Sequence, residues 1–330
     1  MSRGPPTVIT EHKDRRVMAK ANFSGDLTQK TFKQQLCRAG LTAAAETHGQ
    51  LIFLSGLNIF LSITAVLGNT LILVALRKAS CLHPRSSKIL LRSLAVSDLC
   101  VGLISEPLTV TYWMSELNGY WNICHYVWAA GYIASITLCV VSLLTLTAIS
   151  VERLLVLLEM RYRRVVTSKL TYAIVITLWV VSTAITTMYF WNFLIPLWYA
   201  FAVVILCLVT SIFAYTKIFF SLRRYQVQLQ SQTQRNSQEN PIKIARHKKA
   251  VSSALWLQLS LIACYLPHGI VTTLWTNNEL FSSVFLATKY TVTSVFLNSS
   301  LNPILYCWKI EEVRQAVKDT IRQMLCCSSY

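Results

Sequence analysis

The sequence is short of charge, and above all of negative charge. Only 14% of its 330 residues are charged, whereas an ordinary soluble domain carries about 25%. Asp and Glu contribute 14 residues against 31 Lys and Arg, and no charged residue occurs between Lys169 and Lys217. With 54% hydrophobic residues, such a chain is typical of a membrane protein and argues against a water-soluble fold.

Six apolar runs account for most of this hydrophobicity, and each is long enough to cross a membrane, which takes about 20 helical residues. The fourth run would form a helix of about 70 Å, so we expect it to hold two spans. The break is predicted near Trp191, Asn192 and Pro196, because proline removes a backbone donor. Seven spans are therefore predicted, from runs at 51–76, 93–115, 124–151, 170–216, 250–276 and 280–308.

The positive charges lie in alternate connections between the spans, as expected for loops that face the cytoplasm. The other connections hold only Glu116 and Glu279. We therefore expect a multi-pass protein of the plasma membrane, with its N-terminus outside and its C-terminus inside. Because the charges flank spans, the net charge of +17 does not indicate a nucleic-acid partner. The basic residues are Arg77, Lys78, Arg85, Lys88, Arg161, Arg163, Arg164, Lys169, Arg223, Arg224, Arg235, Lys243, Arg246, Lys248 and Lys249.

The chain divides into an extracellular, flexible segment at 1–50, a membrane domain at 51–308, and an amphipathic helix with a short tail at 309–330. We expect no signal peptide in the first segment, which carries a glycosylation sequon at Asn22. Cys37 and Cys124 are predicted to be outside, where they could form one disulfide or stay two free thiols. Cys326 and Cys327 follow the amphipathic stretch and suit palmitoylation, which would anchor it to membrane lipids.

Several polar residues interrupt the spans, where they are costly unless they face water or a partner. Asp98 lies near mid-depth of the second span and Glu106 about two turns further out. The seventh span places polar residues beside Pro303, whose missing donor leaves carbonyls for them to satisfy. Two explanations of these polar residues are open: they line a cavity for a hard monovalent cation, or they form hydrogen bonds between helices. The residues are Asp98, Ser142, Asn298, Ser299, Ser300 and Asn302.

Motifs in all seven predicted spans carry a family resemblance. They are Gly68-Asn69, LAVSD ending at Asp98, ERL at Glu152 to Leu154, Trp179, Tyr215, CYLP at Cys264 to Pro267, and NPILY at Asn302 to Tyr306. On these residues, from Leu51 to about Leu325, the chain resembles a rhodopsin-like (class A) G-protein-coupled receptor. The resemblance implies an all-α bundle of seven transmembrane helices with a short amphipathic eighth helix, a receptor rather than an enzyme, and a heterotrimeric G protein and arrestin as partners.

The resemblance also implies roles for particular residues. Glu152 and Arg153 would pair at rest, and activation would free Arg153 to face the G protein, held by Tyr215 and Tyr306. Asp98, Ser142, Asn298, Ser299 and Asn302 match the family's allosteric sodium site, with no other cofactor implied. Tyr265 replaces the usual tryptophan, and His247 and Lys248 replace an acid that would lock Arg153, which would raise basal activity.

Other departures narrow the subfamily. Most members have a cysteine at Trp128 that bridges to a long extracellular loop, whereas here Cys124 lies one turn higher and the short loop has no cysteine. The usual proline of the fifth span is replaced by Cys207. We therefore interpret the chain as a divergent member near the melanocortin, cannabinoid, lysophospholipid and adenosine receptors, whose melanocortin branch suggests coupling to the stimulatory G protein and cyclic AMP.

The ligand is unknown, although the residues restrict it. Ser135 stands where amine receptors carry an aspartate, so monoamines are not expected, and a largely apolar lining favours a lipid or a peptide. Glu106 and Lys289 would either pair with each other or bind a charged ligand. The predicted pocket comprises Glu106, Tyr112, Tyr132, Ser135, Cys139, Tyr189, Tyr265, His268, Lys289 and Phe296.

Two other classes of membrane protein are alternatives. A zinc-dependent hydrolase would need three or four clustered ligands, but the spans offer only His125 and His268 near the outer surface. A channel or secondary transporter would favour repeated halves or broken helices around a central site. The two halves of this sequence are not similar to each other, which argues against a transporter.

Overall fold

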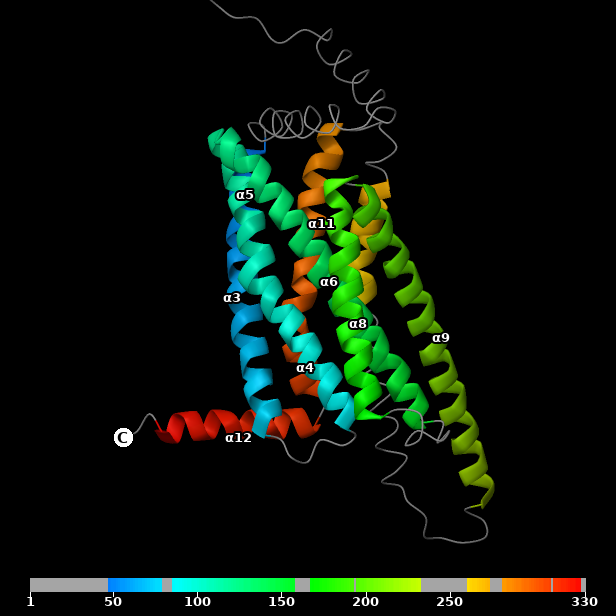
Figure 1. Cartoon of the computed structure of the whole chain (residues 1–330). Helices are drawn as coiled ribbons and strands as arrows, with labels where there is room; N and C mark the ends of the chain where they lie inside the picture. The colour runs from blue at the N-terminus through cyan, green and yellow to red at the C-terminus, as the bar shows by residue number, and fades with distance from the viewer. Residues whose placement is uncertain are drawn as a thin grey trace, which may run out of the picture.

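Helices run through each of the predicted spans in the computed structural model, which describes residues 47–78, 85–157, 167–192, 194–232, 260–273, 281–309 and 311–327 (Figure 1). Residues 260–273 are helical and belong to the sixth predicted span. The other elements are α3 (His48–Lys78), α4 (Arg85–Cys100), the π-helix η1 (Val101–Ser105), α5 (Glu106–Asn118), α6 (Trp121–Leu157), α8 (Ser168–Thr187), the 3-10 helix η2 (Met188–Phe190), α9 (Leu194–Gln232), α11 (Phe281–Lys309) and α12 (Glu311–Cys327).

The predicted break in the long uncharged run is confirmed. The backbone leaves the helix at η2, and Asn192 Oδ1 then accepts the backbone N–H of Leu194 at 2.9 Å where α9 begins. Thr167 similarly caps the start of α8 through its hydroxyl oxygen. Four helical stretches among the described residues are long and apolar enough to cross a membrane: His48–Arg77, Ile123–Glu152, Ser168–Phe190 and Leu194–Ile218.

The second predicted span is longer than its apolar run and is not a uniform helix. A π-helical turn separates α4 from α5, and the N–H of Glu106 bonds to the carbonyl of Val101, five residues back. Pro107 follows and has no N–H for the Gly102 carbonyl, which instead accepts the Ser62 hydroxyl at 2.7 Å. Such a π turn adds a residue to the helix and is frequent at functional sites.

α5 ends at Gly119, whose φ of 69° is the left-handed conformation that glycine adopts at helix C-termini. The helix therefore continues past Glu116, which is buried. The prediction that Glu116 belongs to an extracellular connection is wrong, because the helix continues through Leu117 and ends only at Asn118-Gly119.

Pro303 lies inside α11 and frees the carbonyl of Ser299, four residues back. Asn69 on α3 donates its amide Nδ2 to that carbonyl at 3.2 Å. Gly68 permits the close approach, since a Cβ built on it would lie 3.0 Å from two ring carbons of Pro303. A neighbouring helix thus satisfies the backbone group that proline leaves open, as a lipid environment requires.

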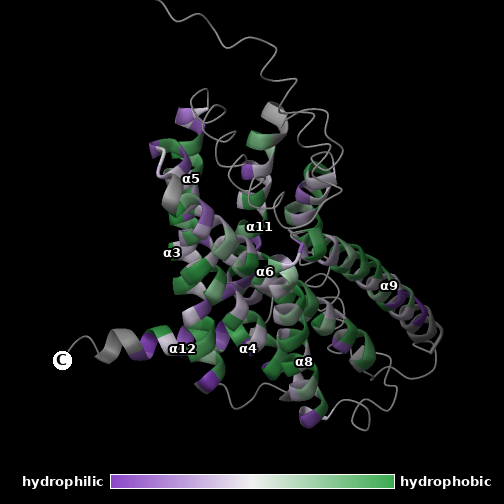
Figure 2. Cartoon of the chain, turned by 45° about the horizontal axis from the view of Figure 1, so that its top comes forward, coloured by the Kyte–Doolittle hydropathy of each residue, from purple (hydrophilic) through white to green (hydrophobic). Residues whose placement is uncertain are grey.

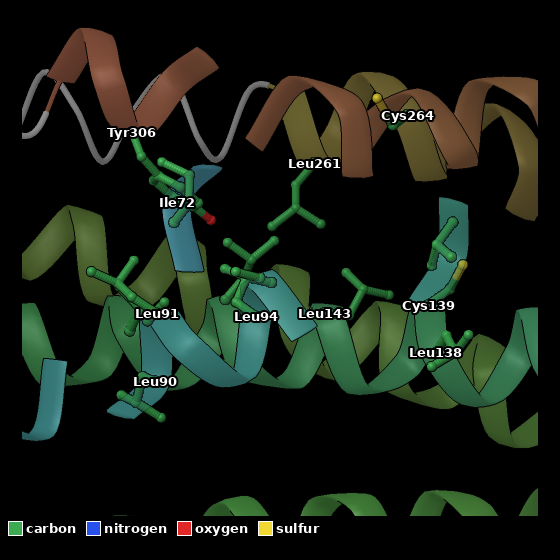
Figure 3. Close-up of a cluster of buried hydrophobic side chains, with 14 of the residues drawn as sticks. Ile72, Leu90, Leu91, Leu94, Leu138, Cys139, Leu143, Leu261, Cys264 and Tyr306 are labelled. Atoms are coloured by element: carbon green, nitrogen blue, oxygen red, sulfur yellow. The ribbon is translucent and has the colours of Figure 1, made fainter. Parts of the chain in front are cut away.

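The core lies along the inner faces of α3, α4, α6, α11 and residues 260–273. In Figure 3, Leu261 from the sixth span and Tyr306 from the seventh face Leu94 of α4 and Leu143 of α6. Large hydrophobic side chains also cover the outside of the bundle; Phe60, for example, is 62% exposed. Figure 2 shows this hydrophobic flank, with hydrophilic residues gathered toward helix ends and on α12. The pattern is that of a bundle surrounded by lipid.

α12 lies across the end of the bundle, roughly perpendicular to α3 (Figure 1). Val313 and Val317 are buried against the core, whereas Lys318 and Asp319 are exposed. This arrangement agrees with the predicted amphipathic eighth helix, whose apolar face follows from the helical spacing of these valines.

Candidate functional site

Asp98 is the centre of a buried polar network at mid-depth. Its carboxylate accepts the hydroxyls of Ser142 at 2.9 Å and Ser299 at 3.0 Å, and the amide Nδ2 of Asn302 at 2.7 Å. The four side chains come from α4, α6 and α11, and Asp98 is fully buried. Because each bond crosses between helices, the network couples the positions of three spans.

Asn298 completes the predicted set without a described bond to Asp98. Its Oδ1 accepts the Ser260 hydroxyl at 3.5 Å, which extends the network toward the sixth span. Its own Nδ2 and the Oδ1 of Asn302 are buried without hydrogen-bond partners. A carboxylate beside an unused amide oxygen and hydroxyls is a donor set that fits a hard monovalent cation.

Glu152 lies at the inner end of α6 and is buried. Its two carboxylate oxygens accept the hydroxyls of Ser86 and Ser87, the second at 2.7 Å, so α6 is joined to the first turn of α4. The side chains of Arg153 and Tyr215 lie outside the described part of the structure, and the predicted pairing of Arg153 with Glu152 stays a prediction. Tyr306 is buried in the core cluster near Ile72 (Figure 3).

The outer ends of α5 and α11 are joined by an ion pair between Lys289 and Glu116, both buried. The Lys289 ammonium also lies over the rings of Tyr112, Trp113 and Phe285, at 4.8, 5.3 and 4.4 Å from their centroids. Ring faces attract cations, and more strongly away from water. We call these five residues the outer ion-pair cluster.

The cluster corrects one of the two interpretations of Glu106 and Lys289. The two residues do not pair, because the partner of Lys289 is Glu116. Glu106 is fully buried, and neither of its carboxylate oxygens has a hydrogen-bond partner in the described structure. The helix stop at Gly119 is the signal in the sequence that would have placed Glu116 in the bundle.

The remaining predicted pocket residues separate into two groups. The rings of Tyr132 of α6 and Tyr189 of η2 are in tilted contact, with 5.5 Å between their centroids, and Trp128 completes the aromatic cluster. Ser135 is half-buried one turn further along α6. These residues lie where the outer halves of α6 and α8 meet.

The second group lies deeper. Cys139 of α6 is hydrogen-bonded to Tyr265, and both belong to the core together with Phe296. His268 Nδ1 and the Thr291 hydroxyl lie 3.2 Å apart. Tyr265 and Phe296 are therefore packed core residues, and His268 has a structural hydrogen bond to α11.

Some predicted sites fall partly or wholly outside the described residues. Asn22 and Cys37 do so entirely, and the side chains of Cys326 and Cys327 at the end of α12 are not described. Cys124 is disulfide-bonded, but its partner is not among the described residues. The pairing with Cys37 therefore stays a prediction.

Sequence comparisons agree with this architecture. Residues 68–306 match the family described as 7 transmembrane receptor (rhodopsin family). Human adenosine receptor A2a is 26% identical, with 79% of this chain and 70% of the relative covered. Sheep (Ovis aries) adenosine receptor A3 is 23% identical, covering 82% and 89%, and human melanocortin receptor 5 is 25% identical, covering 82% and 83%.

These comparisons confirm the predicted neighbourhood of adenosine and melanocortin receptors, and they favour neither the hydrolase nor the transporter alternative. The matching family consists of receptors and not enzymes. The match spans most of the chain and includes Asp98, Glu152 and Tyr306 within its bounds. The chain belongs to the rhodopsin family of seven-transmembrane receptors.

Proposed function

We propose that this receptor converts the binding of an extracellular ligand into activation of a heterotrimeric G protein. The observation that carries the proposal is the Asp98 network, because its bonds to Ser142, Ser299 and Asn302 join three helices midway between the outer ion-pair cluster and Glu152. A movement of α11 at its outer end would have to break or rearrange those bonds. Packed interfaces of this kind switch between discrete arrangements rather than deforming gradually.

At the inner end, Glu152 is the switch partner of Arg153 in this proposal. The Ser86 and Ser87 hydroxyls hold the Glu152 carboxylate, which favours one position of the inner end of α6. Activation would release Arg153 toward the G protein, with Tyr215 and Tyr306 as its new partners. Arrestin would bind the same inner face after activation.

Sodium is the proposed allosteric ion of the Asp98 network. Asp98, Ser142, Ser299 and Asn302 would hold it, with Asn298 at the side toward the sixth span. The support is the chemistry of the donor set and the unused amide oxygen of Asn302. Sodium supplies a compensating positive charge, so the ion would favour the arrangement in which these helices stay together.

The proposed ligand is a lipid or a peptide that enters near Tyr132, Tyr189 and Ser135. The aromatic cluster offers apolar surface, and Ser135 offers no charge to a monoamine. Since two relatives are named adenosine receptors and another a melanocortin receptor, nucleosides and melanocortin-type peptides belong in the test panel. The proposed partner is the stimulatory G protein, which would raise cyclic AMP.

The proposed location is the plasma membrane with the N-terminus outside, glycosylated at Asn22. The disulfide of Cys124 supports its pairing with Cys37 on that side. On the inner side, Cys326 and Cys327 end α12 and would carry palmitate that holds the helix on membrane lipids.

The test is cyclic AMP output in transfected cells against panels of lipids, peptides and nucleosides. Wild type, Arg153→Ala and the control Arg322→Ala, on the exposed face of α12, are compared at equal surface expression. We expect a basal or evoked signal that Arg153→Ala abolishes and Arg322→Ala retains. Equal signals in wild type and Arg153→Ala would disprove the switch.

A further inference from the structure

Glu106 is a buried carboxylate with no compensating group in the described structure. It is the first residue of α5, it is fully buried, and both of its carboxylate oxygens lack a hydrogen-bond partner. An ionised carboxylate in such a place is strongly unfavourable unless a charge or hydrogen-bond donors compensate it. The position therefore requires a positively charged group or a proton.

The buried cation among the described residues is already engaged elsewhere. Among the lysines and arginines that the structure describes, Lys289 is the one that is buried. Its ammonium pairs with Glu116 and is surrounded by aromatic rings. Glu116 lies ten residues beyond Glu106 along the span, about 15 Å of helix. The Lys289 side chain thus extends outward and leaves Glu106 without a countercharge.

A second unpartnered acceptor lies on α3. Asn58 is fully buried, and its amide Nδ2 donates to the Leu54 carbonyl and the Thr293 hydroxyl, both at 2.8 Å. A carbonyl can only accept, so the orientation of the amide is fixed and its Oδ1 faces away from these partners. That oxygen has no hydrogen-bond partner in the described structure.

The contact between α3 and η1 places this oxygen and Glu106 at the same depth. The Ser62 hydroxyl meets the Gly102 carbonyl at 2.7 Å. The helices run in opposite directions, so four residues before Ser62 and four residues after Gly102 are both about one turn further out. Those positions are Asn58 and Glu106. The hydroxyl oxygen of Ser105, beside Glu106, is also buried without a partner.

We propose that Glu106 and the Asn58 amide oxygen, with the Ser105 hydroxyl, form a second cation site, which takes a group of single positive charge. One carboxylate with neutral oxygens balances a single charge, whereas calcium prefers six to eight oxygens. The site is eight residues beyond Asp98, about 12 Å of helix, and is separate from the Asp98 network. The occupant is an alkali ion or a ligand's ammonium group, which share this chemistry.

The site goes beyond the proposed signalling function, because cation binding can be measured without a G protein. The probe is thermal unfolding of the purified receptor in lipid nanodiscs. Sodium chloride, n-butylammonium chloride and N-methyl-D-glucamine chloride are compared at equal ionic strength, the last as a cation too large to be enclosed. All variants carry Asp98→Asn, which removes the carboxylate of the other network.

In this background we expect sodium or butylammonium to raise the apparent Tm by about 2–4 °C, and Glu106→Gln to abolish the rise. Ser105→Ala breaks no described hydrogen bond of the Ser105 hydroxyl, so it should keep the fold and raise the half-maximal cation concentration several-fold. A response to sodium identifies an alkali site, and a response to butylammonium alone identifies an ammonium site.

The proposal is overturned if neither cation shifts Tm more than N-methyl-D-glucamine does, or if Glu106→Gln responds like its parent. Glu106 would then be a protonated acid with no site around it. Glu106→Gln should also unfold at a higher temperature than its parent in N-methyl-D-glucamine, since it removes an uncompensated charge. This second measurement shows whether the Glu106→Gln variant is folded. An unchanged Tm in N-methyl-D-glucamine would indicate that Glu106 carries no uncompensated negative charge.

Discussion

Replacing Glu116 with glutamine tests the outer ion-pair cluster. Glu116→Gln keeps the shape of the side chain but leaves the Lys289 ammonium, only 4% exposed, without its counterion. Removing one partner of a buried ion pair costs about 3–5 kcal/mol. The rings of Tyr112, Trp113 and Phe285 still surround the ammonium, and each is worth about 0.5–2 kcal/mol. We therefore expect Glu116→Gln to cost about 3 kcal/mol of stability, the lower end of the range for a broken buried pair.

For a chain of this size, about 2 °C of Tm corresponds to 1 kcal/mol, so Glu116→Gln should lower the apparent Tm in nanodiscs by roughly 6 °C. The double variant Glu116→Gln/Lys289→Met removes both charges and should recover most of that loss. Asp319→Asn, exposed on α12, is the matched control and should change little. A single variant within 1 °C of wild type, or a double variant less stable than either single one, would refute the buried pair.

Two further predictions concern helix contacts. Gly68→Ala should lower Tm, because its Cβ would lie 3.0 Å from Pro303 and overpacking costs about 1–3 kcal/mol. A Cβ at Gly56 on the same helix meets no atom within 4 Å. Gly56→Ala should therefore stabilise the receptor by up to about 1 kcal/mol of helix propensity and raise Tm slightly. Equal Tm shifts for the two variants would contradict the close packing of Gly68 against Pro303. Ser86→Ala/Ser87→Ala should raise basal cyclic AMP per surface receptor, because two charge-assisted hydrogen bonds of about 1.5–3 kcal/mol each are lost at the inner end of α6; an unchanged or lower basal signal would show that these bonds do not restrain activation.

The spans and their break were predictable because they depend on length, charge and proline, which are local properties. The Asp98 network was also predictable in outline, since Pro303 and the polar residues around it demand partners across the bundle. Its detail was not: Asn298 reaches Ser260 at 3.5 Å rather than Asp98. Which of several equivalent amides bonds to a carboxylate depends on the rotation of each helix, which spacing alone does not determine.

The outer end was predicted less well. Glu106 and Lys289 lie at a similar depth by residue count, which suggested a pair, but a lysine side chain is long and turns outward to Glu116. The π turn before Glu106 changes the register of the span by one residue, and a pattern of apolar residues at helical intervals does not reveal it. Tyr265 and Phe296 were predicted for the pocket and are packed in the core; aromatic residues suit either role, so their part in ligand binding stays a prediction.

The central claim is that the inner end of this receptor activates a G protein through Arg153. The direct measurement is nucleotide exchange on purified heterotrimeric G proteins, the stimulatory class included, with the receptor in nanodiscs. We predict that the Ser86→Ala/Ser87→Ala receptor accelerates exchange on at least one class, and that adding Arg153→Ala removes the acceleration. No acceleration on any class, or the same acceleration after Arg153→Ala, would contradict the account.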